Sequence, residues 1–233
     1  MDALITSQTP NAVADTGGAN IIGRMYKDIV QDMIDSYAYG QYDVNVNRGG
    51  WRYSWNQAPD NSAAQWGAIG MMPAEEQWGL TVPAWVKTEN LVWLDYSQYY
   101  TGYATTASYD GAFGYTGKST GQATTASGMV QLAFDGLTSS DGRWVGAENY
   151  LRRYWSQFFT SGADYYSMFA FTKAMRQAKP AAVEVVCDNA LCASNGLTPI
   201  DWYNDPTDGF ARRLVDKQNA DGSWDGGNRY YIV

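Results

Sequence analysis

The chain has 233 residues, of which 45% are hydrophobic and 15% aromatic, including 10 Trp and 18 Tyr. This composition argues against a disordered chain and predicts a folded protein with a sizeable core rich in aromatic rings. The net charge of −8, without a basic cluster, argues against nucleic acid as a partner. Histidine is absent, so the commonest general base and metal ligand is missing, and we expect neither a metal site nor a cofactor.

Residues 1–19 are rich in Thr, Asn, Ala and Gly and predict an extended entry segment. A helical period from Ile21 to about Tyr39 then predicts an amphipathic helix, which is followed by a turn around Gly49-Gly50-Trp51. The next segment, from Ser62 to Met72, has helix-cap residues in front of it and no charged residue, which is typical of a buried helix. Pro83 then opens a second amphipathic helix.

The same order recurs along the rest of the chain. A turn over 110–115 precedes an uncharged segment over 124–134, and an amphipathic helix capped by Asp141 precedes a mostly apolar helix over 164–175. A last amphipathic helix leads into Gly222-Ser223-Trp224. Counting a degenerate turn near Gly162, the turns lie about 50 to 60 residues apart, which indicates repeats of one outer helix, one turn and one inner helix. Two layers of helices curving into an α/α barrel follow from this alternation.

Several motifs together carry a family resemblance. They are Gly50-Trp51-Arg52-Tyr53, Asp60-Asn61-Ser62, Gly111-Ala112-Phe113-Gly114-Tyr115, Thr124-Thr125-Ala126-Ser127-Gly128, Asp164-Tyr165-Tyr166, and Gln218 followed by Gly222-Ser223-Trp224. The chain resembles the terpenoid cyclase and protein prenyltransferase superfamily, and within it the prenyltransferase/squalene-oxidase-type repeat proteins of unassigned activity. This resemblance implies an all-α fold in which residues 20–233 form an α/α toroid with QW-like turns.

The catalytic motifs of that superfamily do not recur here. The chain has no Asp-x-Asp-Asp run, no Asp, Cys and His set for zinc, and no Cys-Gly-Glu-Gln thioester motif. We therefore expect a ligand-binding module without catalysis of its own. The alternative is an enzyme that uses a carboxylic acid on an isoprenoid or a polysaccharide.

The toroid implied by the resemblance also predicts where a ligand would bind. The N-termini of its inner helices point to one end of the barrel, where polar and aromatic side chains would form a pocket for a small apolar or carbohydrate ligand. These residues are Asp60, Asn61, Gln65, Trp66, Gln122, Thr125, Ser127, Asp164, Tyr165 and Tyr166. Asp60 and Asp164 are the best catalytic candidates. In the simpler interpretation Asp60, Asp164 and Thr125 are helix caps, and Trp66 belongs to the core.

Two further expectations concern the environment of the protein. Cys187 and Cys192 are close enough in sequence to form a disulfide, which would place the protein in the periplasm or outside the cell, although two free thiols remain an alternative. No segment is apolar over a length that spans a bilayer. Four outer helices against three inner ones predict a toroid that is incomplete at both ends. Its open edges would pair with another copy or with a neighbouring domain.

Overall fold

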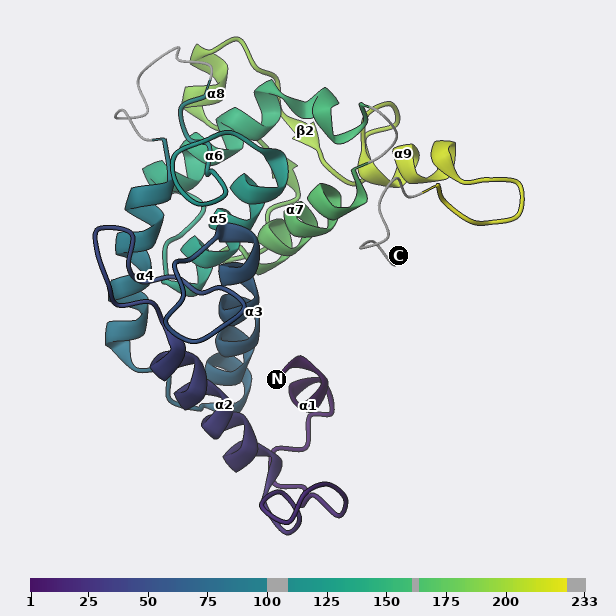
Figure 1. Ribbon diagram of the computed structural model, residues 1–233. Helices are drawn as coiled ribbons and strands as arrows, with labels where there is room; N and C mark the ends of the chain where they lie inside the picture. The colour runs from purple at the N-terminus through teal and green to yellow at the C-terminus, as the bar shows by residue number, and fades with distance from the viewer. Residues whose placement is uncertain (100–108, 161–163, 226–233) are drawn as a thin grey trace. The chain divides into compact units, whose positions relative to one another are not determined.

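The structure is a computed structural model that describes residues 1–99, 109–160 and 164–225 (Figure 1). It is mostly helical, which confirms the predicted all-α class. Within the described ranges the only strands are β1 (Val185–Val186) and β2 (Ile200–Asp201), which pair antiparallel. The chain divides into two compact units, Met1–Tyr96 and Ser97–Val233, which are described separately below. The arrangement of these helices as a partial or open toroid remains a prediction.

The first unit contains α1 (Asp2–Thr6), α2 (Tyr26–Gly40), α3 (Asn61–Trp78) and most of α4 (Ala84–Ser97). The expected extended entry over 1–19 begins instead with helix α1, because Ile5 is buried and α1 packs against α3. Helix α2 starts five residues later than predicted, after a turn in which the Gly23 amide donates to the Ala14 carbonyl at 2.8 Å.

Helix α3 is the predicted buried helix. The Asp60 carboxylate caps its first turn by accepting from the Ala63 amide at 2.8 Å, and Gly79 ends it in the left-handed conformation. The helix continues six residues beyond the uncharged segment from which it was predicted, through Pro73 to Trp78. Most of its residues are buried, as a helix without charges around its first three turns requires.

The second unit contains α5 (Gln122–Phe134), α6 (Gly142–Arg153), the 3-10 helix η1 (Trp155–Phe158), α7 (Tyr165–Gln177), α8 (Ala190–Ser194) and α9 (Phe210–Lys217). Helix α5 packs mainly against α7 and also against α6, and its residues from Thr125 to Phe134 are all buried. Both uncharged segments of the sequence therefore lie in the interior of their units, as predicted.

A cluster of aromatic rings fills the core between η1, α7 and the start of α9. Trp155 stacks on Phe210 with ring centroids 5.2 Å apart, and Phe158 and Phe171 contact both rings edge-on. Trp202 adds a further edge contact to Phe210 at 5.9 Å. These rings come from segments up to 55 residues apart, from Trp155 to Phe210. The cluster therefore connects α9 to η1.

One turn geometry occurs three times in the described part of the chain. In each turn a glutamine side-chain amide donates to the carbonyl of a glycine with positive φ, and an aromatic residue follows that glycine by two positions. The three sets are Gln41, Gly49 and Trp51; Gln98, Gly111 and Phe113; and Gln218, Gly222 and Trp224. The fourth expected turn, near Gly162, includes residues outside the described ranges.

The first two of these turns are each covered by the second helix that follows in the chain, α4 for turn 41–51 and α6 for turn 98–113. The Gln41 amide also donates to the Val86 carbonyl in α4 at 2.9 Å, and the Gln98 amide donates to the Arg143 carbonyl in α6 at 3.0 Å. A Cβ atom on Gly49 or Gly111 would overlap a backbone carbonyl of that helix. The glycines are therefore required both by positive φ and by the close approach of a helix.

Candidate ligand-binding site

An open pocket of about 500 Å³ lies in the first unit, between α1, α2 and α3. It is lined by Met1, Ala3, Met33, Tyr37, Trp66, Ile69 and Gly70. Trp66 is the one residue of this lining that the sequence analysis selected as a ligand contact. Its side chain is 47% exposed, so it is not a core residue and presents a large ring surface to whatever enters the pocket.

Small residues and one buried ring position the pocket walls. Tyr37 packs edge-on against the buried Trp51, with ring centroids 6.5 Å apart, and the Trp51 indole donates to the Tyr37 carbonyl at 2.8 Å. On α3, a Cβ atom at Gly70 would come within 2.8 Å of the Met1 side chain. Glycine at this position therefore allows Met1 to lie directly against the helix.

The polar candidates of the first unit form hydrogen bonds at the start of α3. Asp60 is fully buried, accepts from the Ser62 hydroxyl at 2.6 Å as well as from the Ala63 amide, and lies 3.3 Å from the Arg52 guanidinium. The Asn61 side chain accepts from the Trp93 indole at 2.8 Å, and the Gln65 amide donates to the Ser62 carbonyl at 3.1 Å. These contacts hold α3 and α4 in place, and none of the three residues lines the pocket.

On α5 the candidates Gln122, Thr125 and Ser127 have different surroundings. Gln122 donates to the side chain of Gln157, whereas the Thr125 hydroxyl accepts from the Phe113 amide at 3.1 Å. Ser127 is buried and donates back to the Ala123 carbonyl at 2.7 Å. Thr125 is not the predicted cap, because α5 begins at Gln122 after Gly121, which places Thr125 inside the helix.

The candidates on α7 are a helix cap and two tyrosines. Asp164 accepts from the Ser167 amide at 3.1 Å and from the Ser167 hydroxyl. Tyr165 is buried, and burial together with the nearby Asp225 carboxylate raises its pKa. Tyr166 is partly buried. The ten candidates thus lie in two separately described units, and their convergence at one end of a barrel remains a prediction.

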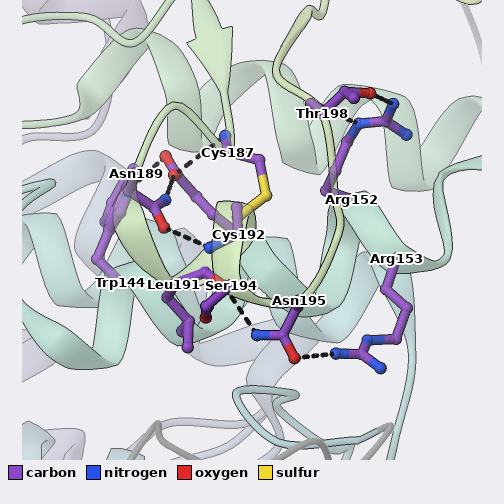
Figure 2. The surroundings of a disulfide bond; sticks show 11 residues. Trp144, Arg152, Arg153, Cys187, Asn189, Leu191, Cys192, Ser194, Asn195 and Thr198 are labelled. Carbon is purple, nitrogen blue, oxygen red and sulfur yellow. Dashed lines mark hydrogen bonds between the residues drawn. A yellow bond between two sulfur atoms is a disulfide. The ribbon is translucent and has the colours of Figure 1, made fainter.

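A disulfide joins Cys187 to Cys192 and lies next to a buried carboxyl group (Figure 2). The Asn189 side chain caps α8 by accepting from the Cys192 amide at 3.0 Å and donates to Glu148 at 3.2 Å. Glu148 also accepts from the Trp144 indole at 2.9 Å and from the Cys187 amide at 3.3 Å. Burial raises the Glu148 pKa to about 7, although these three hydrogen bonds act in the opposite direction.

Glu148 was not among the predicted site residues, yet a repeat in the sequence points to it. Residues 85–98 and 144–157 share Trp, Val, Glu, Asn, Ser and Gln at the same six positions, 59 residues apart. In this repeat Glu148 corresponds to Glu89, so both amphipathic helices carry a glutamate at the same position. It does not reveal the burial of Glu148, which depends on the unrepeated segment around the disulfide.

No protein-family model matches this chain, and no curated protein or solved structure matches it significantly. The resemblance to the terpenoid cyclase superfamily therefore stays a prediction. No helix in the described residues has the length and apolar character needed to cross a membrane. The same residues contain no group of three or more Cys, Asp or Glu side chains placed to hold a metal ion.

Proposed function

We propose that this protein is a ligand-binding module without catalysis of its own, and that a small apolar ligand occupies the pocket beside Trp66. The observation that carries this proposal is the lining of that pocket. Its side chains are aromatic, aliphatic or thioether groups, and their only nitrogen and oxygen atoms are the Tyr37 hydroxyl and the Trp66 indole nitrogen. The volume of about 500 Å³ is within the usual range for small-molecule sites.

The environments of the two catalytic candidates support the absence of catalysis. Asp60 is fully buried, paired with Arg52 and engaged as the cap of α3, while Asp164 caps α7. A carboxyl group that acts as a general acid must lie within hydrogen-bonding reach of the substrate. Neither aspartate lines the pocket, and the pocket lining contains no carboxylate.

The wider arrangement that we propose is an α/α toroid in an extracellular or periplasmic protein. The repeated glutamine–glycine–aromatic turn and the alternation of amphipathic and buried helices support the toroid. The disulfide between Cys187 and Cys192 supports an oxidising compartment. Alkylation of the purified, unreduced protein tests the latter: intact-mass measurement should find neither cysteine labelled, and labelling of both would contradict it.

Binding is tested by thermal unfolding with a panel of long-chain alcohols and a panel of oligosaccharides. The apolar compounds should raise the melting temperature, since a ligand at 100 times its dissociation constant adds about 2.7 kcal/mol to the free energy of unfolding. Trp66→Ala should lose this effect. Trp85→Ala is the matched control, because Trp85 is 53% exposed, outside the pocket lining, and its loss should leave binding unchanged.

A second experiment, product analysis, separates this proposal from the enzymatic alternative. Product analysis after incubation with an isoprenoid diphosphate or a polysaccharide should find no turnover. Turnover that is lost in Asp60→Asn or Asp164→Asn would overturn the binding-module proposal, because these variants remove the acid while keeping the hydrogen-bonding shape of the side chain. Stabilisation by oligosaccharides alone would instead reject the apolar ligand.

A further inference from the structure

The buried Glu148 carboxyl group of α6 is connected to both cysteines of the disulfide. Its Oε2 atom accepts from the Cys187 amide at 3.3 Å and from the Asn189 side-chain amide at 3.2 Å. The Asn189 side chain in turn accepts from the Cys192 amide at 3.0 Å (Figure 2). The disulfide closes this chain of contacts. One carboxyl group therefore holds the loop directly at Cys187 and through Asn189 at Cys192.

The two sulfur atoms can react only if this loop moves. Cys187 is 1% exposed and Cys192 is 0% exposed, whereas reduction of a disulfide requires a thiolate to reach one of its sulfurs. Cys187 also has a φ of +69°, a left-handed conformation that is unfavourable for a residue with a side chain. Because reduction removes the covalent bond that holds Cys187 in this conformation, we expect the reduced loop to open.

Neighbouring contacts restrict the opening to a short segment. Strands β1 and β2 pair at the base of the loop. On its far side, Arg152 donates to the Thr198 carbonyl at 2.7 Å, and Arg153 donates to the Asn195 side chain at 3.2 Å (Figure 2). Both arginines belong to α6 and keep the chain attached to that helix from Asn195 onward. The segment that opens is therefore 187–194, which includes α8.

Glu148 is the titratable group in this chain of contacts. Burial raises its pKa to about 7, and the Asp188 carboxylate acts in the same direction. The groups that donate to Glu148 are uncharged, and α8 has no charged side chain. In the open loop the carboxyl group is hydrated, so its pKa returns toward the ordinary value of 4.5. Opening therefore releases a proton when the pH lies between these two values.

We propose that the Cys187–Cys192 disulfide and the Glu148 carboxyl group form a redox switch controlled by pH, in which a dithiol reduces the disulfide and segment 187–194 leaves α6 when Glu148 is ionised. A thiolate of the reductant attacks one cysteine sulfur and breaks the S–S bond. The second thiol of the reductant then displaces that cysteine, so the reductant becomes a disulfide and the protein gains two thiols. Glu148 gives its proton to water. The neutral acid keeps the loop closed at low pH.

Equilibration with mixtures of reduced and oxidised dithiothreitol tests the switch. Both partners exchange two thiols for one disulfide, so below about pH 8 their own protons do not make the equilibrium constant depend on pH. The Glu148 pKa values of about 7 and 4.5 should make the constant for reduction of the protein rise about 60-fold from pH 5 to pH 7.5. Acid quenching, alkylation and intact-mass measurement give the reduced fraction. A constant that does not change with pH overturns the proposal.

Proton release gives a second measurement, which needs no variant. At pH 6 Glu148 is mostly protonated in the closed loop and mostly ionised in the open loop, so reduction should release about 0.9 proton per disulfide. An indicator dye in weakly buffered solution measures this release. Reduction without proton release overturns the proposal. Both measurements concern residues of the second unit and do not depend on a ligand in the pocket beside Trp66.

Glu148→Gln separates the carboxyl group from the rest of the loop. Glutamine resembles the neutral acid, so the equilibrium constant of this variant should stay near the wild-type value for pH 5 over the whole range. Glu89→Gln is the matched control, because Glu89 has the same position in α4 and pairs with Arg48 at the surface, and it should keep the 60-fold rise, which is about the wild-type value. A rise that persists in Glu148→Gln overturns the proposal.

Hydrogen exchange at pH 7.5 locates the opening. Reduction should accelerate exchange over 187–194, while the buried residues of α5 keep their protection. Circular dichroism establishes that each variant is folded before it is compared. Reduction that leaves exchange over 187–194 unchanged, or that unfolds α5 together with the loop, overturns the proposed local switch.

Discussion

The segments Trp85–Gln98 and Trp144–Gln157 have the same six residues at the same positions but different surroundings. Each lies against the glycine of an earlier turn, Trp85–Gln98 against Gly49 and Trp144–Gln157 against Gly111. In the first segment Glu89 pairs at the surface with Arg48 at 2.7 Å. In the second, Glu148 is buried and bonded to the disulfide loop. The repeated residues thus build a common scaffold, and an unrepeated loop changes the chemistry of one carboxyl group.

The largest expected effects come from the aromatic residues of the two covered turns. Trp51→Ala and Phe113→Ala should each lower the free energy of unfolding by about 3–5 kcal/mol, because both rings are buried and each leaves a cavity. Urea unfolding measures both. Tyr115→Ala is the control, since Tyr115 is 43% exposed. If only one of the two substitutions lowers the free energy of unfolding, the two turns are not equivalent.

The second prediction concerns Glu148 and pH. Its pKa rises from 4.5 to about 7 on folding, so between these values the native state binds more protons than the unfolded state. Its contribution to stability is therefore complete below about pH 4.5 and decreases as the pH rises to about 7. The difference between the two pKa values of Glu148 corresponds to about 3 kcal/mol of unfolding free energy.

Urea unfolding from pH 4 to pH 8, without reductant, measures this decrease. Glu148→Gln should remove it, because glutamine does not titrate. Glu89→Gln, which affects only a surface ion pair, should keep the decrease and cost less than about 1 kcal/mol. If the wild type and Glu148→Gln lose the same stability over this pH range, the burial of Glu148 is not its cause.

The third prediction compares a covered turn with the uncovered one. Gly222→Ala should cost about 1–2 kcal/mol, the strain of an L-residue at positive φ. Gly49→Ala should cost about 1–3 kcal/mol more, because its methyl group would also displace the α4 backbone at Glu89. The difference between the two variants in urea unfolding measures how closely the helix covers the turn. Equal costs would contradict this close contact.

These comparisons also show which parts of the fold were accessible from the sequence. Periodicity and the absence of charge predicted the buried helices α3 and α5, and the glycine-rich motifs predicted the turns at Trp51 and Phe113. Such patterns are local, and a few neighbouring residues determine them. Helix α1 was missed because it depends on the burial of Ile5 and on contacts with α3.

The candidate site was less accessible for the same physical reason. Trp66 was selected from the sequence, but Met1, Met33 and Tyr37 complete its pocket from two other helical segments. Asp60 and Asp164 were selected as carboxylates at helix starts, and a sequence does not distinguish a cap from a catalytic acid at that position. The burial of Glu148 likewise requires the loop at Cys187, 39 residues further along the chain.

The smallest expected effect concerns the first turn of α6, which begins differently from the first turn of α4. Helix α4 follows Pro83, whereas the Asp141 carboxylate caps α6 by accepting from the Arg143 amide at 2.9 Å. Asp141→Ala should cost about 0.5–2 kcal/mol, since it leaves that amide without its acceptor, and Asp141→Ser should recover most of the loss. Because the Arg143 carbonyl also receives the Gln98 amide, fraying of α6 would loosen turn 98–113 as well. Hydrogen exchange at the Gln98 side chain and the Arg143 backbone should then accelerate together in Asp141→Ala, and faster exchange at Arg143 alone would show that the turn does not depend on the helix start.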